Sequence, residues 1–178
     1  MTRRTVFKFS AAALPFAQYA LAFQNKAERV SPHETVSADL GGDKVEITYG
    51  RPYLKARTVG KEVAPFGKVW RLGADEASKI TVSAEMQFGE LKLAAGSYSL
   101  FAIPGTDKWT LIVDKVADQW GAFKYEQSQD LGRFDVPVQK LSTPVEEFTI
   151  SVGQQSGKTA KLTFAWGNES VSTTLKSL

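Results

Sequence analysis

Short runs of alternating apolar and polar residues, separated by turn residues, most limit what this 178-residue chain can fold into. In residues 44–49, for example, three apolar residues alternate with polar neighbours, as in a strand with one buried face. No long segment shows the helical period of 3.6 residues. The pattern predicts about nine strands: 44–49, 79–85, one on each side of a turn at Gly89-Glu90, 97–103, 109–113, 148–152, 162–166 and 171–175.

Nine short strands predict an all-β fold, an antiparallel β-sandwich or a jelly-roll-like arrangement, with a long strand-poor connection near 50–79. Residues 97–103 are nearly all apolar or small, so we expect this strand at the centre of a sheet. A final turn is predicted at Gly167-Asn168. Short helical turns are expected near 74–77 and 127–131.

The first 22 residues have the features of a cleavable export signal. Paired arginines, Arg3 and Arg4, precede a modest apolar run, and small residues follow at a cleavage spacing before Phe23. The pattern resembles a twin-arginine signal, which an export receptor reads, although an ordinary secretory leader with two arginines would look similar. The apolar run is too short to span a membrane.

Cleavage at this point predicts a periplasmic or secreted mature protein. Its parts would be a lead-in at 23–33 and a single β-sandwich domain at 34–178. The leader holds three of the 22 basic residues and none of the 19 acids, so the mature chain carries 19 of each. A chain without net charge argues against a nucleic-acid partner.

The chain has no cysteine and a single histidine, His33. A disulfide is therefore excluded, and the usual zinc sites, which need several nitrogen and sulfur ligands, are not expected. No other metal-binding or cofactor-binding pattern is present, so we expect neither a metal nor a cofactor.

Positive charge is concentrated in residues 49–71, where six cations accompany one acid, Glu62: Arg51, Lys55, Arg57, Lys61, Lys68 and Arg71. Two interpretations are open. The three arginines could form a clamp for a carboxylate or phosphate. Alternatively, Arg51 and Arg71 could pair with Asp75 and Glu76 and fix the long connection to the sheets.

Asp75 and Glu76 are also the candidates for acid/base catalysis. Adjacent residues on an extended segment point to opposite sides, so the pair would not readily flank one substrate. A second candidate feature is the aromatic run at 120–125, which includes Trp120 and Tyr125. With Tyr53 it could stack against a ligand, or it could close the end of the core.

Several blocks of the sequence resemble domain-of-unknown-function family 2911, an exported bacterial group, over about residues 31–152. These blocks are Ser31-Pro32-His33, Ile47-Thr48-Tyr49-Gly50-Arg51-Pro52, Arg57, Gly60, Val69-Trp70-Arg71-Leu72-Gly73-Ala74-Asp75-Glu76, Gly96-Ser97-Tyr98-Ser99-Leu100, Ile103-Pro104 and Trp120-Gly121. The resemblance implies export and a shared fold, and it assigns no activity and no residue role.

The favoured prediction is an exported bacterial β-sandwich protein that binds a small polar or anionic ligand, or an envelope partner. The expected binding residues are Arg51, Arg57, Arg71, Asp75, Glu76, Tyr53, Trp120 and Tyr125. The alternative is a hydrolase or other acid/base enzyme that uses Asp75 or Glu76 beside Arg51 and Arg71.

Overall fold

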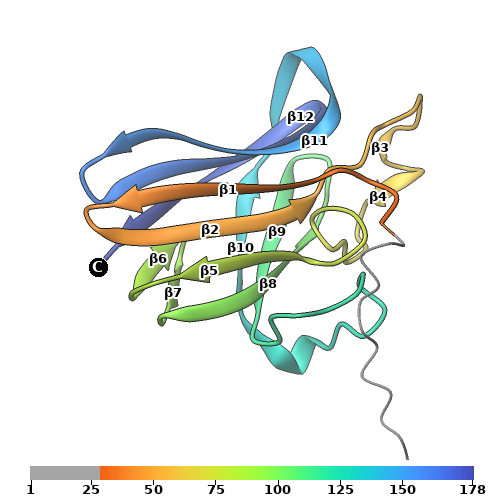
Figure 1. The fold of residues 1–178 in the computed structure, drawn as a ribbon. Helices are drawn as coiled ribbons and strands as arrows, with labels where there is room; N and C mark the ends of the chain where they lie inside the picture. The colour runs from red at the N-terminus through yellow and green to blue at the C-terminus, as the bar shows by residue number, and fades with distance from the viewer. Residues whose placement is uncertain (1–28) are drawn as a thin grey trace, which may run out of the picture.

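Two antiparallel sheets face each other in the computed structural model, which describes residues 29–178 (Figure 1). The predicted export signal lies outside the described residues. The strands are β1 (His33–Leu40), β2 (Asp43–Gly50), β3 (Val59–Gly60), β4 (Val63–Pro65), β5 (Ser78–Val82), β6 (Met86–Phe88), β7 (Leu91–Leu93), β8 (Gly96–Ile103), β9 (Lys108–Asp114), β10 (Asp130–Pro137), β11 (Gln139–Ser156) and β12 (Thr159–Ser177), with one 3-10 turn, η2 (Gln127–Gln129).

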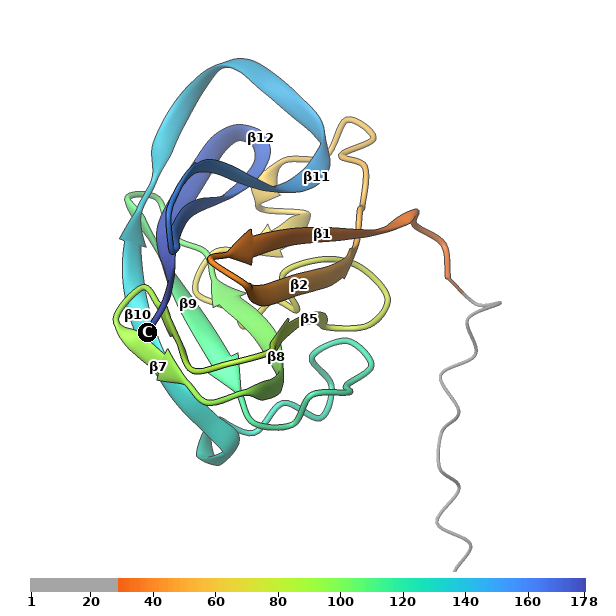
Figure 2. The same cartoon turned by 60° about the vertical axis from the view of Figure 1, so that its left-hand side comes forward.

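The larger sheet has the order β1-β2-β5-β8-β9-β10, and the smaller has the order β11-β12-β6-β7. Figure 2 shows β10 leading along one side of the molecule into β11, which joins the two layers. The predicted all-β sandwich is confirmed, as is the central place of β8 between β5 and β9. The short pair β3 and β4 is parallel and lies within the strand-poor connection.

One predicted turn is wrong. Residues 162–166 and 171–175 belong to the single long strand β12, which continues through Gly167 and Asn168. Gly167 has a φ of 61° and pairs with Val145, and the register shifts on both sides of this pair because β11 carries extra residues there. The hairpin turns instead at residues 157–158. A glycine at positive φ serves a bulge or a turn equally well, which explains the error.

The sequence did not predict β1 and β10, the two edge strands of the larger sheet, nor the short strands β3 and β4. Both β1 and β10 alternate buried and accessible residues, with Leu40 and Phe134 among the buried ones. The helical turn expected near 127–131 is present as η2. The one expected near 74–77 is wrong, because Asp75 takes a φ of 61° and the chain bends there.

The core lies between the sheets. Buried side chains there include Trp109, Phe148, Phe164 and Trp166, whereas Tyr98 is only partly buried against the core. Each fully buried aromatic stabilises the fold by roughly 1.5–3 kcal/mol relative to an exposed one. Within residues 29–178, no helix is long and apolar enough to cross a membrane.

The larger sheet is covered on its outer face as well. Phe101 of β8 and Ile112 of β9 are buried there beneath Ala77, Ala122 and Tyr125. These covering residues come from two connections, the long one at 51–77 and a second at 115–129. This cover explains why β8 is apolar on both faces, and it places the candidate site on this side of the molecule.

Candidate functional site

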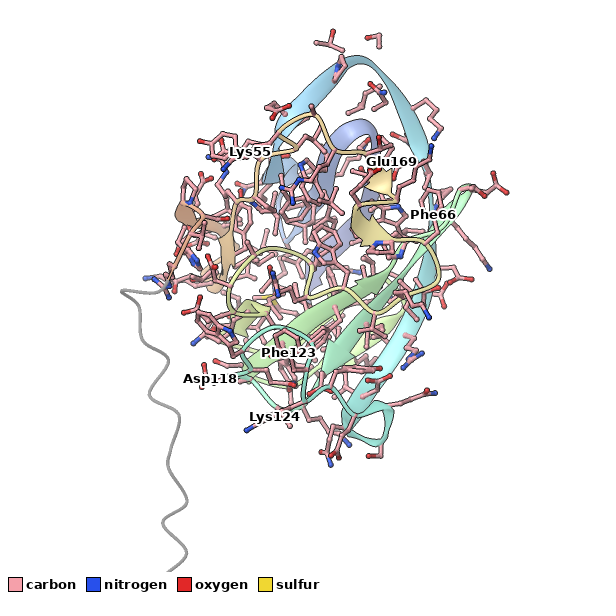
Figure 3. The ribbon with its side chains drawn as sticks, turned by 90° about the vertical axis from the view of Figure 1, so that its right-hand side faces the viewer. Lys55, Phe66, Asp118, Phe123, Lys124 and Glu169 are labelled. Atoms are coloured by element: carbon pink, nitrogen blue, oxygen red, sulfur yellow. The ribbon has the colours of Figure 1, made fainter. Side chains whose placement is uncertain are left out.

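The two connections that cover the larger sheet are joined to each other by backbone hydrogen bonds. Glu76 and Trp120 form an antiparallel bridge, Gly121 N donates to Asp75 O at 3.0 Å, and Ala77 N donates to Gln119 O at 2.9 Å. Figure 3 views this face, with the yellow long connection above the turquoise one. Residues 71–77 are thereby held against 119–121.

Arg51 forms ion pairs that belong to the fold. It leaves the end of β2 and places Nη1 3.0 Å from Glu34 Oε2 on β1 and Nη2 3.1 Å from Glu147 Oε2 on β11. Its remaining donors reach Phe148 O at 3.3 Å and Thr149 Oγ1 at 3.1 Å. The guanidinium group therefore ties the two sheets together. The expected pairing with Asp75 and Glu76 is wrong, because two other acids lie nearer.

Arg57 fixes the turn that precedes it. Its Nε donates to Leu54 O at 2.9 Å and its Nη2 donates to Tyr53 O at 2.8 Å. The side chain is exposed, and these bonds use two of its nitrogens and hold the guanidinium plane in place. Arg57 is a cation with a fixed position.

Arg71 differs from both. Within residues 29–178, its buried Nε has no hydrogen-bond acceptor and its guanidinium group forms no ion pair. Burial lowers the pKa of Arg71, and the nearby Asp75 carboxylate opposes that shift. A half-buried guanidinium without a hydrogen-bonded acid is unusual, because a buried charge normally has a partner. The expected pairing of Arg71 with Asp75 or Glu76 is not found.

Arg57 and Arg71 line one cavity of about 380 Å³, which we call the arginine groove. Its third charged side chain is Glu62, and its apolar lining includes Trp70, Phe123 and Trp166. Two of the three arginines predicted to form a clamp therefore share a concavity. Arg51 does not contribute to it.

Phe123 projects beside Arg71 from the 115–129 connection. Its side chain is 84% exposed, and Figure 3 shows it on the turquoise connection near the middle of this face. Gly121, at φ 65°, allows the close approach, because a Cβ there would lie 2.9 Å from the Phe123 ring and 3.2 Å from Arg71 Nη1. The groove thus joins an unpaired cation and an exposed ring.

Asp75 and Glu76 bind the start of β1 and the segment before it, and neither pairs with Arg51 or Arg71. Asp75 Oδ2 lies 3.1 Å from His33 Nε2 and accepts a hydrogen bond from Ser31 N at 3.3 Å. Glu76 accepts hydrogen bonds from Arg29 Nε at 2.9 and 3.1 Å. Although burial alone would raise the pKa of Glu76, its bonds to Arg29 and to backbone outweigh burial and lower it.

The two acids lie on the same side, contrary to the expectation for an extended segment. The positive φ of Asp75 turns its carboxylate so that both acids approach His33 Nε2, Glu76 at 3.5 Å. A cavity of about 270 Å³ adjoins this cluster, lined by Arg29, His33 and Glu76. Both carboxylates have protein partners, so the acid/base role stays a prediction without a specific observation in its favour.

The three predicted aromatic residues do not gather at the groove. Tyr53 is beside Glu147, which raises the pKa of its hydroxyl. Tyr125 donates to Asp130 at 2.9 and 3.1 Å, accepts from Arg133 and packs on Phe101; burial and then Asp130 raise its pKa to about 12. Trp120 is half-buried and contributes its backbone to the bridge with Glu76.

Sequence reasoning missed the groove residues Glu62, Phe123 and Trp166 as site residues. Phe123 carried one usable signal, since it is the middle aromatic of the run at 120–125 and Gly121 precedes it. In the part of the chain that the structure describes, no group of three or more His, Cys, Asp or Glu side chains is arranged to hold a metal ion.

Comparison with known proteins gives one result. No curated protein and no solved structure matches the chain. Residues 31–175 match the model of a family described as protein of unknown function, DUF2911. Since the match spans most of the chain and includes every residue of the arginine groove, the chain belongs to the DUF2911 family.

Proposed function

We propose that this protein binds a small anionic ligand in the arginine groove, with the ligand's acid on Arg71. The supporting observation is that Arg71 Nε is buried and finds no acceptor within residues 29–178, while the side chain lines an open cavity. Leaving a buried charged donor unsatisfied costs more than the roughly 1–3 kcal/mol of a neutral one. A ligand in the cavity cannot reach the buried Nε, but its acid can accept hydrogen bonds from the Nη atoms of Arg71, which are not fully buried and have no partner among residues 29–178.

The groove also has the composition of a ligand site. It is concave, it combines apolar residues with three charged side chains, and its volume falls within the usual range for small-molecule sites. A guanidinium group offers two parallel N–H donors to a carboxylate or phosphate. Phe123, which is largely exposed, provides apolar surface for the rest of the ligand.

The test is thermal unfolding and tryptophan fluorescence with a panel of anions: inorganic phosphate, 3-phenylpropionate and glucuronate. Trp70 and Trp166 line the groove, so their emission reports binding there. We expect at least one anion to raise the melting temperature of the wild type and to have no effect on Arg71→Ala. Arg71→Lys should bind more weakly, because an ammonium group lacks the planar fork.

Lys68→Ala is the matched control, since Lys68 is an exposed cation of the same connection and does not line the groove. It should bind the anion like the wild type. The proposal fails if no anion in the panel binds, or if Arg71→Ala binds as well as the wild type.

We also propose that the protein acts outside the cytoplasm, in the periplasm or as a secreted protein. The support is the sequence at 1–22, with Arg3 and Arg4 before an apolar run. Changing both arginines to lysine should leave the precursor in the cytoplasm, and N-terminal sequencing of the wild-type product should begin at or near Phe23. Normal export of the double variant would exclude the twin-arginine route.

A further inference from the structure

Phe123 and the accessible end of Arg71 both lie against Gly121. A Cβ on Gly121 would lie 2.9 Å from two atoms of the Phe123 ring and 3.2 Å from Arg71 Nη1. The ring edge and this nitrogen are therefore no farther apart than those two distances together. One small molecule can contact both, with its acid on Arg71 and a neighbouring group on the ring.

The accessible apolar surface of the arginine groove includes this ring. Its apolar lining residues that are at least partly exposed are Pro52, Val69, Ala122 and Phe123. Ala122 precedes Phe123 in the chain, and it packs with Val69 against the same cluster on the outer face of the larger sheet. Trp70 and Trp166 are buried. The apolar part of a ligand would thus rest on Phe123 and its neighbours, and not on the tryptophans.

The charged lining matches a single negative charge. Two arginines and one glutamate line the groove, so one positive charge is in excess. Backbone hydrogen bonds, and more weakly the charges of Lys61 and Arg57, lower the pKa of Glu62, so Arg57 and Glu62 partly offset each other. Arg71 has no hydrogen-bond partner among residues 29–178, which leaves one guanidinium group for one acid. A phosphate dianion would bring a second, uncompensated negative charge into a partly enclosed site, which is unfavourable.

We propose that the groove is specific for a monocarboxylate that carries an aromatic ring a few bonds from its acid. The carboxylate accepts hydrogen bonds from the Nη atoms of Arg71, and the ring packs on Phe123. This inference rests on the proposed function and narrows its ligand class. Phe123 determines the specificity, because a phenyl ring gains contact with an aromatic ligand and offers no hydrogen bond to a hydroxylated one. Sugar acids and inorganic anions are thereby disfavoured.

The experiment compares 3-phenylpropionate with three probes that each lack one of its properties. Acetate lacks the ring, 3-phenylpropionamide lacks the charge, and glucuronate keeps the charge but has a hydroxylated body. Calorimetric titration of the wild type should show 3-phenylpropionate binding about tenfold tighter than acetate or glucuronate, because one face of its ring is buried on Phe123. The amide should also bind about tenfold more weakly, because it cannot form the charge-assisted hydrogen bonds to Arg71.

Two variants assign these differences to residues. Phe123→Ala should reduce the affinity for 3-phenylpropionate to about that for acetate and should leave acetate binding unchanged. Arg71→Gln should lose the binding of both acids. Val116→Ala is the matched control, because it truncates another exposed apolar side chain of the 115–129 connection that does not line the groove, and it should change nothing. Circular dichroism confirms that each variant is folded.

The outcomes separate the two proposals. Equal binding of 3-phenylpropionate and acetate, or tighter binding of glucuronate or inorganic phosphate, overturns the aromatic-carboxylate inference and leaves anion binding intact. A preference for 3-phenylpropionate that persists in Phe123→Ala also overturns it. If no acid binds to the wild type, or if the acids bind to Arg71→Gln as tightly as to the wild type, the inference fails together with the proposed function.

Discussion

Arg51 and Arg71 come from the same basic stretch, yet their surroundings are opposite. Arg51 contacts Glu34, Glu147, Phe148 O and Thr149, and these partners come from strands of both sheets. Arg71 has a buried Nε without an acceptor among residues 29–178, and it opens onto a cavity. Arg51 is held by partners within the fold, whereas Arg71 lines a cavity and lacks a partner among the described residues.

The difference teaches that a local excess of charge in a sequence can serve two purposes at once. Arg51 follows directly on β2, so it lies where β1 and β11 present acids. Arg71 precedes a bend whose two acids face the other way, towards Arg29 and His33. The partners of Arg51 come from strands β1 and β11, whereas Arg71 finds none among residues 29–178.

The largest effect is expected from Arg51→Met. It would leave Glu34 and Glu147 without their shared cation and would remove a tie between the sheets. The free energy of unfolding should fall by about 2–3 kcal/mol, less than for a fully buried pair because both acids are partly accessible. Urea unfolding measures the change, with Lys61→Met, an exposed cation of the same stretch, as the control. A loss below about 0.5 kcal/mol would place Arg51 among ordinary surface charges.

Tyr49→Phe tests the same network with a smaller expected effect. The Tyr49 hydroxyl donates to Glu34 at 3.1 Å and accepts from Ile150 N at 3.0 Å, so its removal leaves a buried amide unsatisfied. We expect a loss of about 1–2 kcal/mol. An unchanged free energy of unfolding would show that the hydrogen bonds of Tyr49 to Glu34 and Ile150 do not stabilise the fold.

Tyr49 also predicts a dependence on alkaline pH. Burial is the main cause that raises the pKa of Tyr49 to about 12, from an ordinary value of 10.0. Because the folded-state pKa is the higher one, the contribution is complete below about pH 10 and is lost between about pH 10 and 12. Tyrosinate absorbance during alkaline titration should show late titration of both Tyr49 and Tyr125, and Tyr49→Phe should lose one of these two late-titrating groups.

Glu76→Gln should cost about 1 kcal/mol, through the lost ion pair with Arg29. The pKa of Glu76 is lowered in the folded protein, so its contribution is present above about pH 4.5 and is lost as the pH falls further. Unfolding between pH 6 and 3 should therefore be less acid-dependent in the variant. Anion binding should be unchanged, and a loss of binding would assign Glu76 to the groove instead.

The fold was predictable from the sequence because strand signals are local. The alternating run at 44–49 predicts a half-buried strand, which the structure contains as β2. The Gly89-Glu90 turn predicts a hairpin, which is present as β6 and β7. The errors arose where one local signal has two meanings. Gly167 could begin a turn or continue a strand opposite a bulge in β11, and only the register with β11 decides between them.

The site was predictable only in part, because a side chain's partners depend on packing between distant segments. The sequence pointed to the right stretch and to Arg57 and Arg71, but it grouped Arg51 with them. The neighbours that separate the arginines are Glu147 in β11 and Phe123 in the second connection, far from the basic stretch in the sequence. The bend at Asp75 was also unforeseen, since a non-glycine residue at positive φ has no reliable local signal.

The most direct measurement of the contrast is the free energy of unfolding of Arg71→Met beside the wild type, with and without 3-phenylpropionate. Without the anion, we expect the variant to be as stable as the wild type or up to about 1 kcal/mol more stable, because an unpaired, partly buried charge is replaced by an apolar side chain. With the anion at about 100 times its dissociation constant, the wild type should gain about 2.7 kcal/mol and the variant nothing. A variant that loses 2–3 kcal/mol without the anion, beside a wild type that gains nothing with it, would show that Arg71 is as structural as Arg51.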